Sequence, residues 1–360
     1  SAEENTGVGI GALDALTTGD HNVAIGYNAG TSINQGSKNI VVGFAAGDAL
    51  SSGSNNIAIG HNALTTEDTG DNSVAIGRNA LQNQNYNGSS HNIAIGRDAG
   101  QSVTTGVRNT LIGAAAGDAI TTGEFNVAMG YGALGSATDT DQSVAIGHGA
   151  LAALNYSGDS NNTAVGHNTG AALVGGIKNT LLGAFAGDAL VGGHKNVAVG
   201  YNALSTEDGD GRNVAVGHEA LKNQNAGTDA YNVAVGYDAG LSVTTGTLNT
   251  IIGGLAGDAL TTGDSNVAIG YAAMGAADGT ESRNVAIGYG TLATMNNDAS
   301  NYNTAVGYAA GFSITTGINN TIIGGQAGDS LTTGSENVAI GKSALGAEDG
   351  GSGNVSFVIL

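Results

Sequence analysis

A nine-residue phrase recurs along the whole chain. "NVAIGYNAG" at 22–30 is followed by "NIVVGFAAG" at 39–47 and "NIAIGHNAL" at 56–64. The phrase begins at residue 5 and returns every 17 residues, except that from residue 73 onwards roughly every fourth interval is 19 and the interval after 266 is 18. A unit this short cannot bury an apolar face alone and has to stack on its neighbours. The repeat therefore restricts the fold more than the length of the chain does.

Each unit combines one short apolar run with turn-rich sequence, which predicts one coil of a parallel β-solenoid. We expect an all-β fold of about 21 coils, with four coils forming a larger repeat of about 70 residues and residues 1–360 forming a single domain. Positions are numbered here from the first residue of the phrase. Side chains alternate along a strand, so positions 2 and 4, such as Val23 and Ile25, are predicted to fill the coil, while position 3, such as Ala24, faces outward.

A second core column is expected in the turn-rich part. In one pair of coils position 9 is Gly and position 12 is aliphatic, and in the other pair position 9 carries the large side chain. The position-12 residues are Ile33, Leu50, Val103, Ile120, Leu190 and Leu260, and the position-9 residues are Leu64, Leu81, Leu134, Leu204, Leu221 and Met274. Asn at position 1 and Gly at position 5 bracket the strand, and stacked Asn amides are expected to hydrogen-bond from coil to coil.

Position 3 is apolar although it is expected to face outward. It is Ala in most coils and is bulky once in each larger repeat, at Val41, Leu111, Leu181, Ile251 and Ile322. A strand that is apolar on both faces is buried on both, and a long exposed apolar strip promotes aggregation. These five residues are therefore predicted to lie in an interface between chains; the alternative is that a loop of the same coil covers position 3.

Charge and composition exclude several classes of protein. Ten basic against 30 acidic residues give a formal net charge of −20, which opposes binding to nucleic acid. No stretch approaches the roughly 18 consecutive apolar residues that a membrane helix needs, so no membrane insertion is expected. The apolar fraction of 41% is too high for a disordered chain.

Two known groups of proteins have similar phrases. "SVAIGRNAL" at 73–81 and "SVAIGHGAL" at 143–151 resemble the head repeat of trimeric autotransporter adhesins, and "NTIIGGLAGDALTTGDS" at 249–265 is similar to repeats of phage and marine-microbial tail-fibre-like proteins. The resemblance implies a left-handed parallel β-roll, a homotrimer and a location outside the cell, on a virion or a cell surface. Adhesin head repeats are usually shorter than 17 residues, and the heptad stalk and membrane anchor of a complete adhesin are not found, which favours a fibre segment.

Residues for catalysis are not arranged as a site. Equivalent carboxylates recur four coils apart, roughly 19 Å, which is too far for a catalytic acid pair. No phosphate-binding loop and no calcium-binding nonapeptide is present, although calcium at loop carboxylates stays an alternative. His148 and His167 lie on consecutive coils and could form a metal pair. We expect no enzyme and no cofactor.

Position 6 holds a recurring aromatic residue that could contact a host receptor or a glycan. Its tyrosines are Tyr27, Tyr131, Tyr201, Tyr237, Tyr271, Tyr289 and Tyr308. An ice-binding role for the Thr-Thr-Gly segments is an alternative, but they occupy only half of the coils and belong to turns.

The predicted function is that of a structural fibre or stalk segment that assembles with itself. The alternatives are an adhesin head that binds a receptor or glycan, and a secreted subunit that stacks end to end through its apolar last segment, "NVSFVIL" at 354–360.

Overall fold

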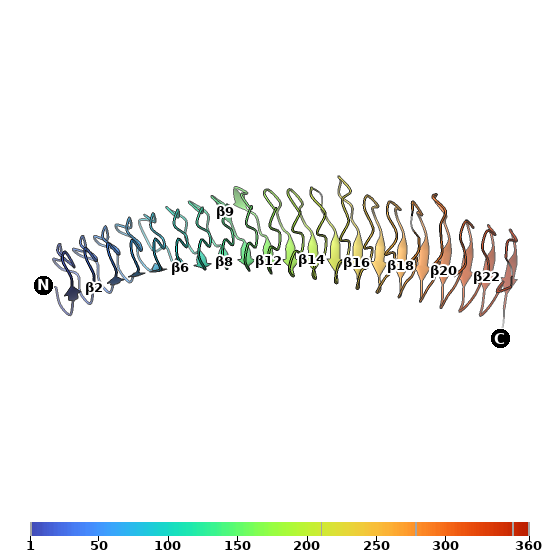
Figure 1. Ribbon diagram of the computed structural model, residues 1–360, viewed down its shortest axis with the longest axis horizontal. Helices are drawn as coiled ribbons and strands as arrows, with labels where there is room; N and C mark the ends of the chain where they lie inside the picture. The colour runs from blue at the N-terminus through green and yellow to red at the C-terminus, as the bar shows by residue number, and fades with distance from the viewer. Residues whose placement is uncertain (1, 210, 278, 348, 359–360) are drawn as a thin grey trace. The chain divides into compact units, whose positions relative to one another are not determined.

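The computed structural model describes residues 2–209, 211–277, 279–347 and 349–358, and within them the chain is all-β with no helix. Two compact units are distinguished, Ser1–Lys178 and Asn179–Leu360. Each unit is a parallel β-solenoid in which one three-residue strand marks each coil, and the strands of a unit follow one another along one side of its coils (Figure 1). The predicted fold class is therefore confirmed. Residues 359 and 360 of the predicted stacking segment lie outside the described residues.

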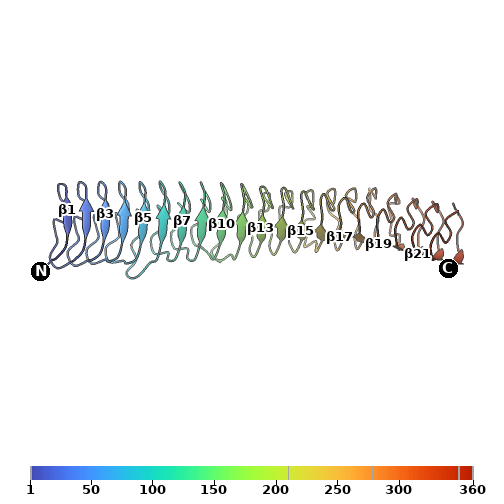
Figure 2. The same ribbon diagram turned by 90° about the horizontal axis from the view of Figure 1, so that it is seen from below.

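In the first unit each strand pairs in parallel with the next, position for position, as between Val23 and Ile40 (Figure 2). The strands are β1 (Thr6–Val8), β2 (Val23–Ile25), β3 (Ile40–Val42), β4 (Ile57–Ile59), β5 (Val74–Ile76), β6 (Ile93–Ile95), β7 (Thr110–Ile112), β8 (Val127–Met129), β10 (Val144–Ile146) and β12 (Thr163–Val165). Two short strands in the longer turns, β9 (Thr140–Asp141) and β11 (Gly158–Asp159), pair with each other.

The second unit repeats this arrangement, with Val197 opposite Val214 and Val214 opposite Val233. Its strands are β13 (Thr180–Leu182), β14 (Val197–Val199), β15 (Val214–Val216), β16 (Val233–Val235), β17 (Thr250–Ile252), β18 (Val267–Ile269), β19 (Val285–Ile287), β20 (Thr304–Val306), β21 (Thr321–Ile323), β22 (Val338–Ile340) and β23 (Val355–Phe357). Each coil thus completes the backbone hydrogen bonding of its neighbour, as a solenoid requires.

The strand faces are the reverse of the prediction. Position 3 points into the coil, and Ala24 and Val41 are fully buried. Positions 2 and 4 point outward, so Val23 is only half-buried and Ile25 is 42% exposed. Alternation correctly placed positions 2 and 4 on one face, but it does not say which face is inside. The interior is narrow, and the Leu and Ile side chains of the turn-rich segment already fill it, so that the strand contributes mostly Ala.

The bulky residues at position 3 are consequently not an interface between chains. Val41, Leu111, Leu181, Ile251 and Ile322 are all fully buried inside the coils of a single chain. Each lies opposite a glycine at position 9 of its own coil. A Cβ added to Gly47 would lie 2.5 Å from Cγ1 of Val41, and one added to Gly117 would lie 2.8 Å from Cδ2 of Leu111. The large side chain occupies the volume that the glycine leaves, which is the physical reason for the correlated change.

The two other predicted columns are confirmed. All the aliphatic residues expected at positions 9 and 12 are buried. The Asn residues at position 1 form a ladder: the backbone N–H of Asn39 donates to Oδ1 of Asn22 (2.9 Å), and Nδ2 of Asn39 donates to the carbonyl oxygen of Gly53 (2.8 Å). These bonds satisfy buried amides at each strand start, where an unpaired polar group would destabilise the fold.

Glycine at position 5 is required by both backbone conformation and space. Gly26 has a φ of 137°, which side chains rarely adopt, and a Cβ there would lie 2.3 Å from the carbonyl oxygen of Gly43 in the next coil. The strand therefore ends at the same point in successive coils, and this keeps positions 2 to 4 in register.

Candidate functional site

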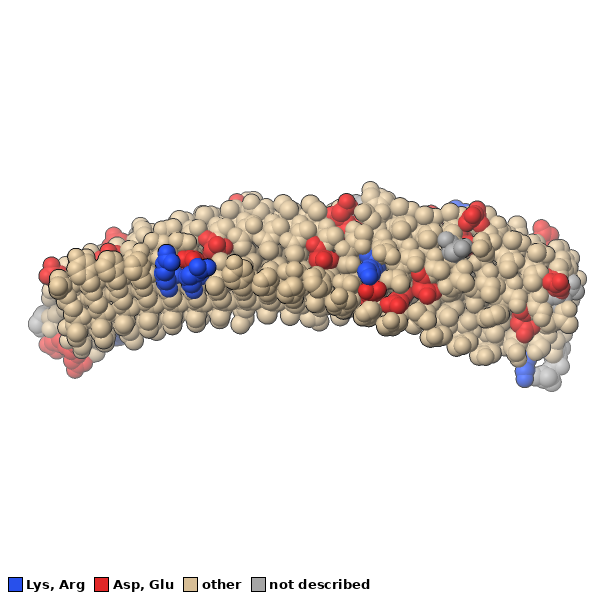
Figure 3. Space-filling model, in the orientation of Figure 1, with Lys and Arg blue, Asp and Glu red and all other residues tan. Residues whose placement is uncertain are grey.

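The outward-facing strand residues form an uncharged apolar surface on each unit, which we call the outer strip. It consists of positions 2 and 4 of every coil, and each of these residues is Val, Ile, Leu, Met or Thr, apart from Phe357 at the last position. Ile40 and Ile59 in the first unit and Leu182 and Ile323 in the second are among its exposed members. On the face of the molecule shown in Figure 3, basic and acidic side chains are few and scattered.

The strip is regular because the register of the strands is exact. Side chains at position 2 follow one another from coil to coil, as do those at position 4, at the spacing of hydrogen-bonded strands, about 4.8 Å. β-branched side chains have few rotamers, so both rows are ordered with little loss of side-chain entropy. Large apolar patches of this kind mark surfaces of association.

The aromatic residues at position 6 form short stacks. Tyr27, Phe44 and His61 stack in the first unit, with ring centroids 5.3 and 5.1 Å apart, and Tyr271, Tyr289 and Tyr308 do so in the second, at 5.5 and 5.3 Å. Coils with a small residue at position 6 interrupt the stacks, as Gly254 does.

All seven tyrosines that were predicted as a recognition column are on the surface, about half exposed. Each packs against at least one neighbouring aromatic ring, however, and Tyr289 is stacked on both faces, which leaves less ring face for a sugar to stack on. The hydroxyl groups and ring edges remain exposed. Recognition of a receptor or glycan by this column stays a prediction.

The predicted histidine pair has an unsuitable geometry for one metal ion. His148 and His167 stack with centroids 5.1 Å apart and an angle of 14° between the rings. Imidazole lone pairs lie in the ring plane, so nearly parallel stacked rings direct them within separate planes, whereas two ligands of one ion have to converge on it at about 2.0 Å.

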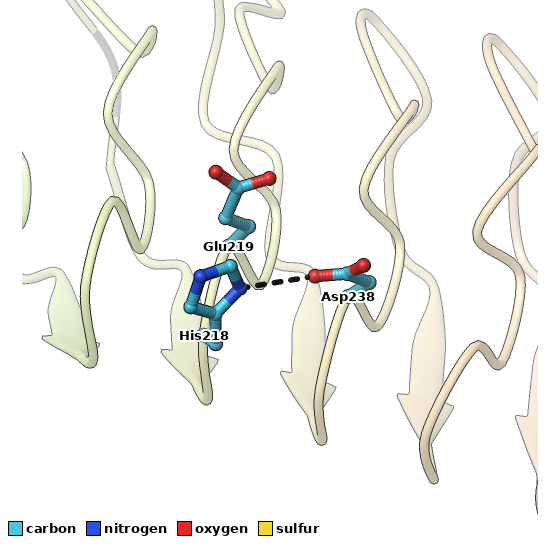
Figure 4. Close-up of side chains that lie close together, drawn as sticks. All are labelled: His218, Glu219 and Asp238. Carbon is cyan, nitrogen blue, oxygen red and sulfur yellow. Dashed lines mark hydrogen bonds and ion pairs between the residues drawn. The ribbon is translucent and has the colours of Figure 1, made fainter.

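A different cluster meets the geometry of a metal site, and the sequence analysis missed it. His218, Glu219 and Asp238 each offer one donor atom, and these atoms lie within 4.8 Å of one another (Figure 4). His218 and Glu219 follow strand β15, and Asp238 follows strand β16. The signal in the sequence was an acidic residue at position 7 of two consecutive coils, next to a histidine at position 6.

Carboxyl groups inside the coils were also missed. Glu67 is fully buried and accepts hydrogen bonds from the backbone N–H of Gly70 (2.8 Å) and from Nε2 of Gln84 (3.0 Å). Burial raises the pKa of Glu67 above its usual value, although these hydrogen bonds oppose the shift. Four coils further on, in the next larger repeat, the equivalent positions hold Ala137 and Leu154, and both are fully buried. The interior therefore accepts either a polar or an apolar pair.

The recurring Asp residues of the "AGDAL" segments do not gather into a cluster of carboxylates in the part of the chain that the structure describes. Burial raises the pKa of Asp48, Asp118, Asp188 and Asp258, but among the described residues none of them belongs to a group of three donors. Calcium binding at loop carboxylates therefore has no geometric support there.

No model of a known protein family matches the sequence, and no curated protein matches it. The resemblance to adhesin heads and tail-fibre-like repeats accordingly stays a prediction. No helix long and apolar enough to cross a membrane occurs among the described residues.

Proposed function

We propose that this chain is a non-enzymatic structural segment of a fibre or stalk and that it assembles with copies of itself through the outer strip. The main observation in support of this proposal is that positions 2 and 4 are apolar or Thr in every coil and yet point away from the interior. Nothing inside the coil requires this composition, since the interior is filled by position 3 and by the turn residues. A partner surface would account for it.

A second copy of the chain fits this surface best. The strip has a fixed axial period, and a parallel copy offers rows of side chains at the same period. Burying a Val or Ile side chain completely contributes about 1.5 to 3 kcal/mol, and part of this gain repeats in each coil. The association energy therefore grows with the number of coils, which suits a fibre. The resemblance to adhesin heads and tail fibres supports three copies and a location on a virion or cell surface.

The experiment is a mass measurement by sedimentation equilibrium on three proteins. The first is the unaltered chain, and the second carries Ile25→Glu, Val42→Glu and Ile59→Glu on the outer strip. The third is a control with the same added charge on exposed turns, Thr18→Glu, Gln35→Glu and Ser52→Glu.

We expect trimers for the unaltered chain and the control, and monomers with an unchanged circular dichroism spectrum for the strip variant. A monomeric unaltered chain at tens of micromolar would refute the proposal. A mass that rises continuously with concentration would instead favour end-to-end stacking.

An adhesin role is the second candidate, because the seven tyrosines of position 6 are each about half exposed on the surface of the coils. Such a protein would bind defined glycans on an array, and a Tyr271→Phe, Tyr289→Phe, Tyr308→Phe variant would lose that binding. An array without a signal would contradict the adhesin role, and the structural role would be the remaining candidate.

A further inference from the structure

The cluster of His218, Glu219 and Asp238 combines one imidazole and two carboxylates on neighbouring coils of the second unit. His218 Nδ1 lies 3.2 Å from Oδ1 of Asp238, and the carboxylate of Glu219 lies beside the same imidazole (Figure 4). We infer that these three residues bind one divalent transition-metal ion, for which Zn²⁺ is the best match.

The distances suit such an ion. Nitrogen and oxygen ligands lie about 2.0 to 2.2 Å from Zn²⁺, so the donors of a tetrahedral site are separated by roughly 3.3 to 3.5 Å. The separation between His218 and Asp238 is close to this value, and the donor atoms of all three residues lie within 4.8 Å of one another, so Glu219 has to turn toward the other two ligands when an ion binds. Three protein ligands leave one position for water.

The fold holds His218 and Asp238 in place before an ion arrives. The ring of His218 is stacked between Tyr201 and Tyr237, with centroids 5.5 and 5.1 Å away. The backbone N–H of Asp238 donates to the carbonyl oxygen of His218 (2.9 Å), which fixes the spacing of the two coils. A site whose ligands are already oriented loses little entropy on binding.

Contacts behind Glu219 also match a metal site. Lys222 Nζ (2.8 Å) and Asn202 Nδ2 (3.3 Å) both donate to its Oε1, and hydrogen bonds of this kind orient metal-binding carboxylates. Two carboxylates against one ammonium leave a net negative charge around the donors, which favours a cation.

The donor set favours a transition metal over calcium. Imidazole is a good ligand for Zn²⁺, whereas Ca²⁺ takes six to eight oxygen ligands and would find only two carboxylates here.

The first unit contains a natural control for the cluster. At the equivalent positions His61 is followed by Asn62, and the next coil carries Asn79. The ring of His61 stacks on Phe44 much as His218 stacks on its neighbours. Amides replace both carboxylates, and a neutral amide is a much weaker ligand, so the His61 cluster should not hold the ion.

The test is titration calorimetry of the full chain with ZnCl₂ at pH 7.5, with CaCl₂ in parallel. We expect one Zn²⁺ per chain and no heat from Ca²⁺. His218→Asn, Glu219→Gln and Asp238→Asn should each weaken binding at least about tenfold, while His61→Asn should leave it unchanged. Circular dichroism checks that each variant stays folded.

Three results would overturn the inference. The first is that Zn²⁺ does not bind stoichiometrically, which would mean that the ion is absent. The second is an equal loss of Zn²⁺ affinity in His61→Asn and His218→Asn, and the third is an unchanged affinity in both carboxylate variants. Either of the last two would mean that the ion is held elsewhere. The inference does not depend on assembly through the outer strip, because all three ligands belong to one chain.

Discussion

Inside the coils, position 3 carries side chains that are fully buried in every strand from Ala24 to Ala339, such as Ala145 in β10, while outside the same strand Val144 and Ile146 are only half-buried. Both faces are apolar, yet they differ in how their composition varies. Inside, sizes change in compensating pairs, as with Val41 and Gly47. Outside, nearly every residue is Val, Ile or Thr. The interior residues are thus matched to one another in size, and the exterior is nearly uniform, as a surface for another chain would be.

The largest effect on stability is expected from a charge at the interior position. In Ala145→Glu a carboxylate would enter a space that is closed by the Ala residues of the adjacent strands, Ala128 and Ala164. Overpacking and an unpaired buried charge each destabilise strongly, so the free energy of unfolding should fall by more than about 4 kcal/mol. Urea unfolding followed by circular dichroism measures this change. A loss below about 1 kcal/mol would mean that the coil can open at this strand.

The second-largest effect on stability is expected at the buried polar pair of Glu67 and Gln84. Gln84→Leu removes the shorter of two hydrogen bonds to Oε2 of Glu67 and leaves only the one from the backbone N–H of Tyr86 (3.3 Å). The loss of this partner to a buried carboxylate should lower the free energy of unfolding by roughly 3 kcal/mol. The double variant Glu67→Ala, Gln84→Leu reproduces the apolar pair of Ala137 and Leu154 and should recover most of that loss. Urea midpoints of the two variants provide the test. Equal losses would show that the site depends on local packing more than on hydrogen bonding.

The residues changed in these predictions separate what could be predicted from the sequence from what could not. The fold, the Asn ladder and the columns at positions 9 and 12 follow from spacing and composition, because stacked coils have to repeat the same contacts. The inner face was assigned wrongly, because "VAI" is apolar throughout and alternation carries no information about direction. Glu67 was missed as an interior residue because it stands in a turn-like segment, "TTEDTG". Its burial follows from its place at position 12, which is the position that the buried Leu50 occupies in the preceding coil.

The metal cluster was missed for a related reason. Its residues come from two coils, and their proximity depends on the position-for-position register that the structure shows, as between Val216 and Val235. Along the chain, "HEA" at 218–220 and "YDA" at 237–239 have the composition of exposed polar turns. Only the register between the two coils places His218 beside Asp238.

A smaller effect is expected from pH. Burial raises the folded-state pKa values of Glu67 and of four Asp residues above the ordinary 4.5 and 3.8. The folded chain therefore takes up protons at a higher pH than the unfolded chain, and stability should increase as the pH falls from 7 toward about 5. Below the ordinary values both states are protonated and the gain stops.

Asp139 and Glu219 act in the opposite sense. Side-chain hydrogen bonds lower their pKa values, so their contribution is present at neutral pH and is lost as the pH falls below the ordinary values. Melting temperatures at pH 7 and pH 5 measure the net change, and the rise should be smaller in the Glu67→Ala, Gln84→Leu variant. A lower melting temperature at pH 5 would contradict this assignment of the buried carboxyls.

The smallest effect on the coil itself is expected from Ile146→Glu, one residue away from Ala145 but on the outer strip. The new carboxylate reaches water without displacing an interior side chain, so at a dilution where both proteins are monomeric the free energy of unfolding should change by about 0.5 kcal/mol or less. At higher concentration the same substitution places a charge in the proposed contact between copies, and the sedimentation mass should fall toward that of a monomer. A large loss of monomer stability would show that positions 2 and 4 support the coil from outside, and the outer strip would then need no partner to explain its composition.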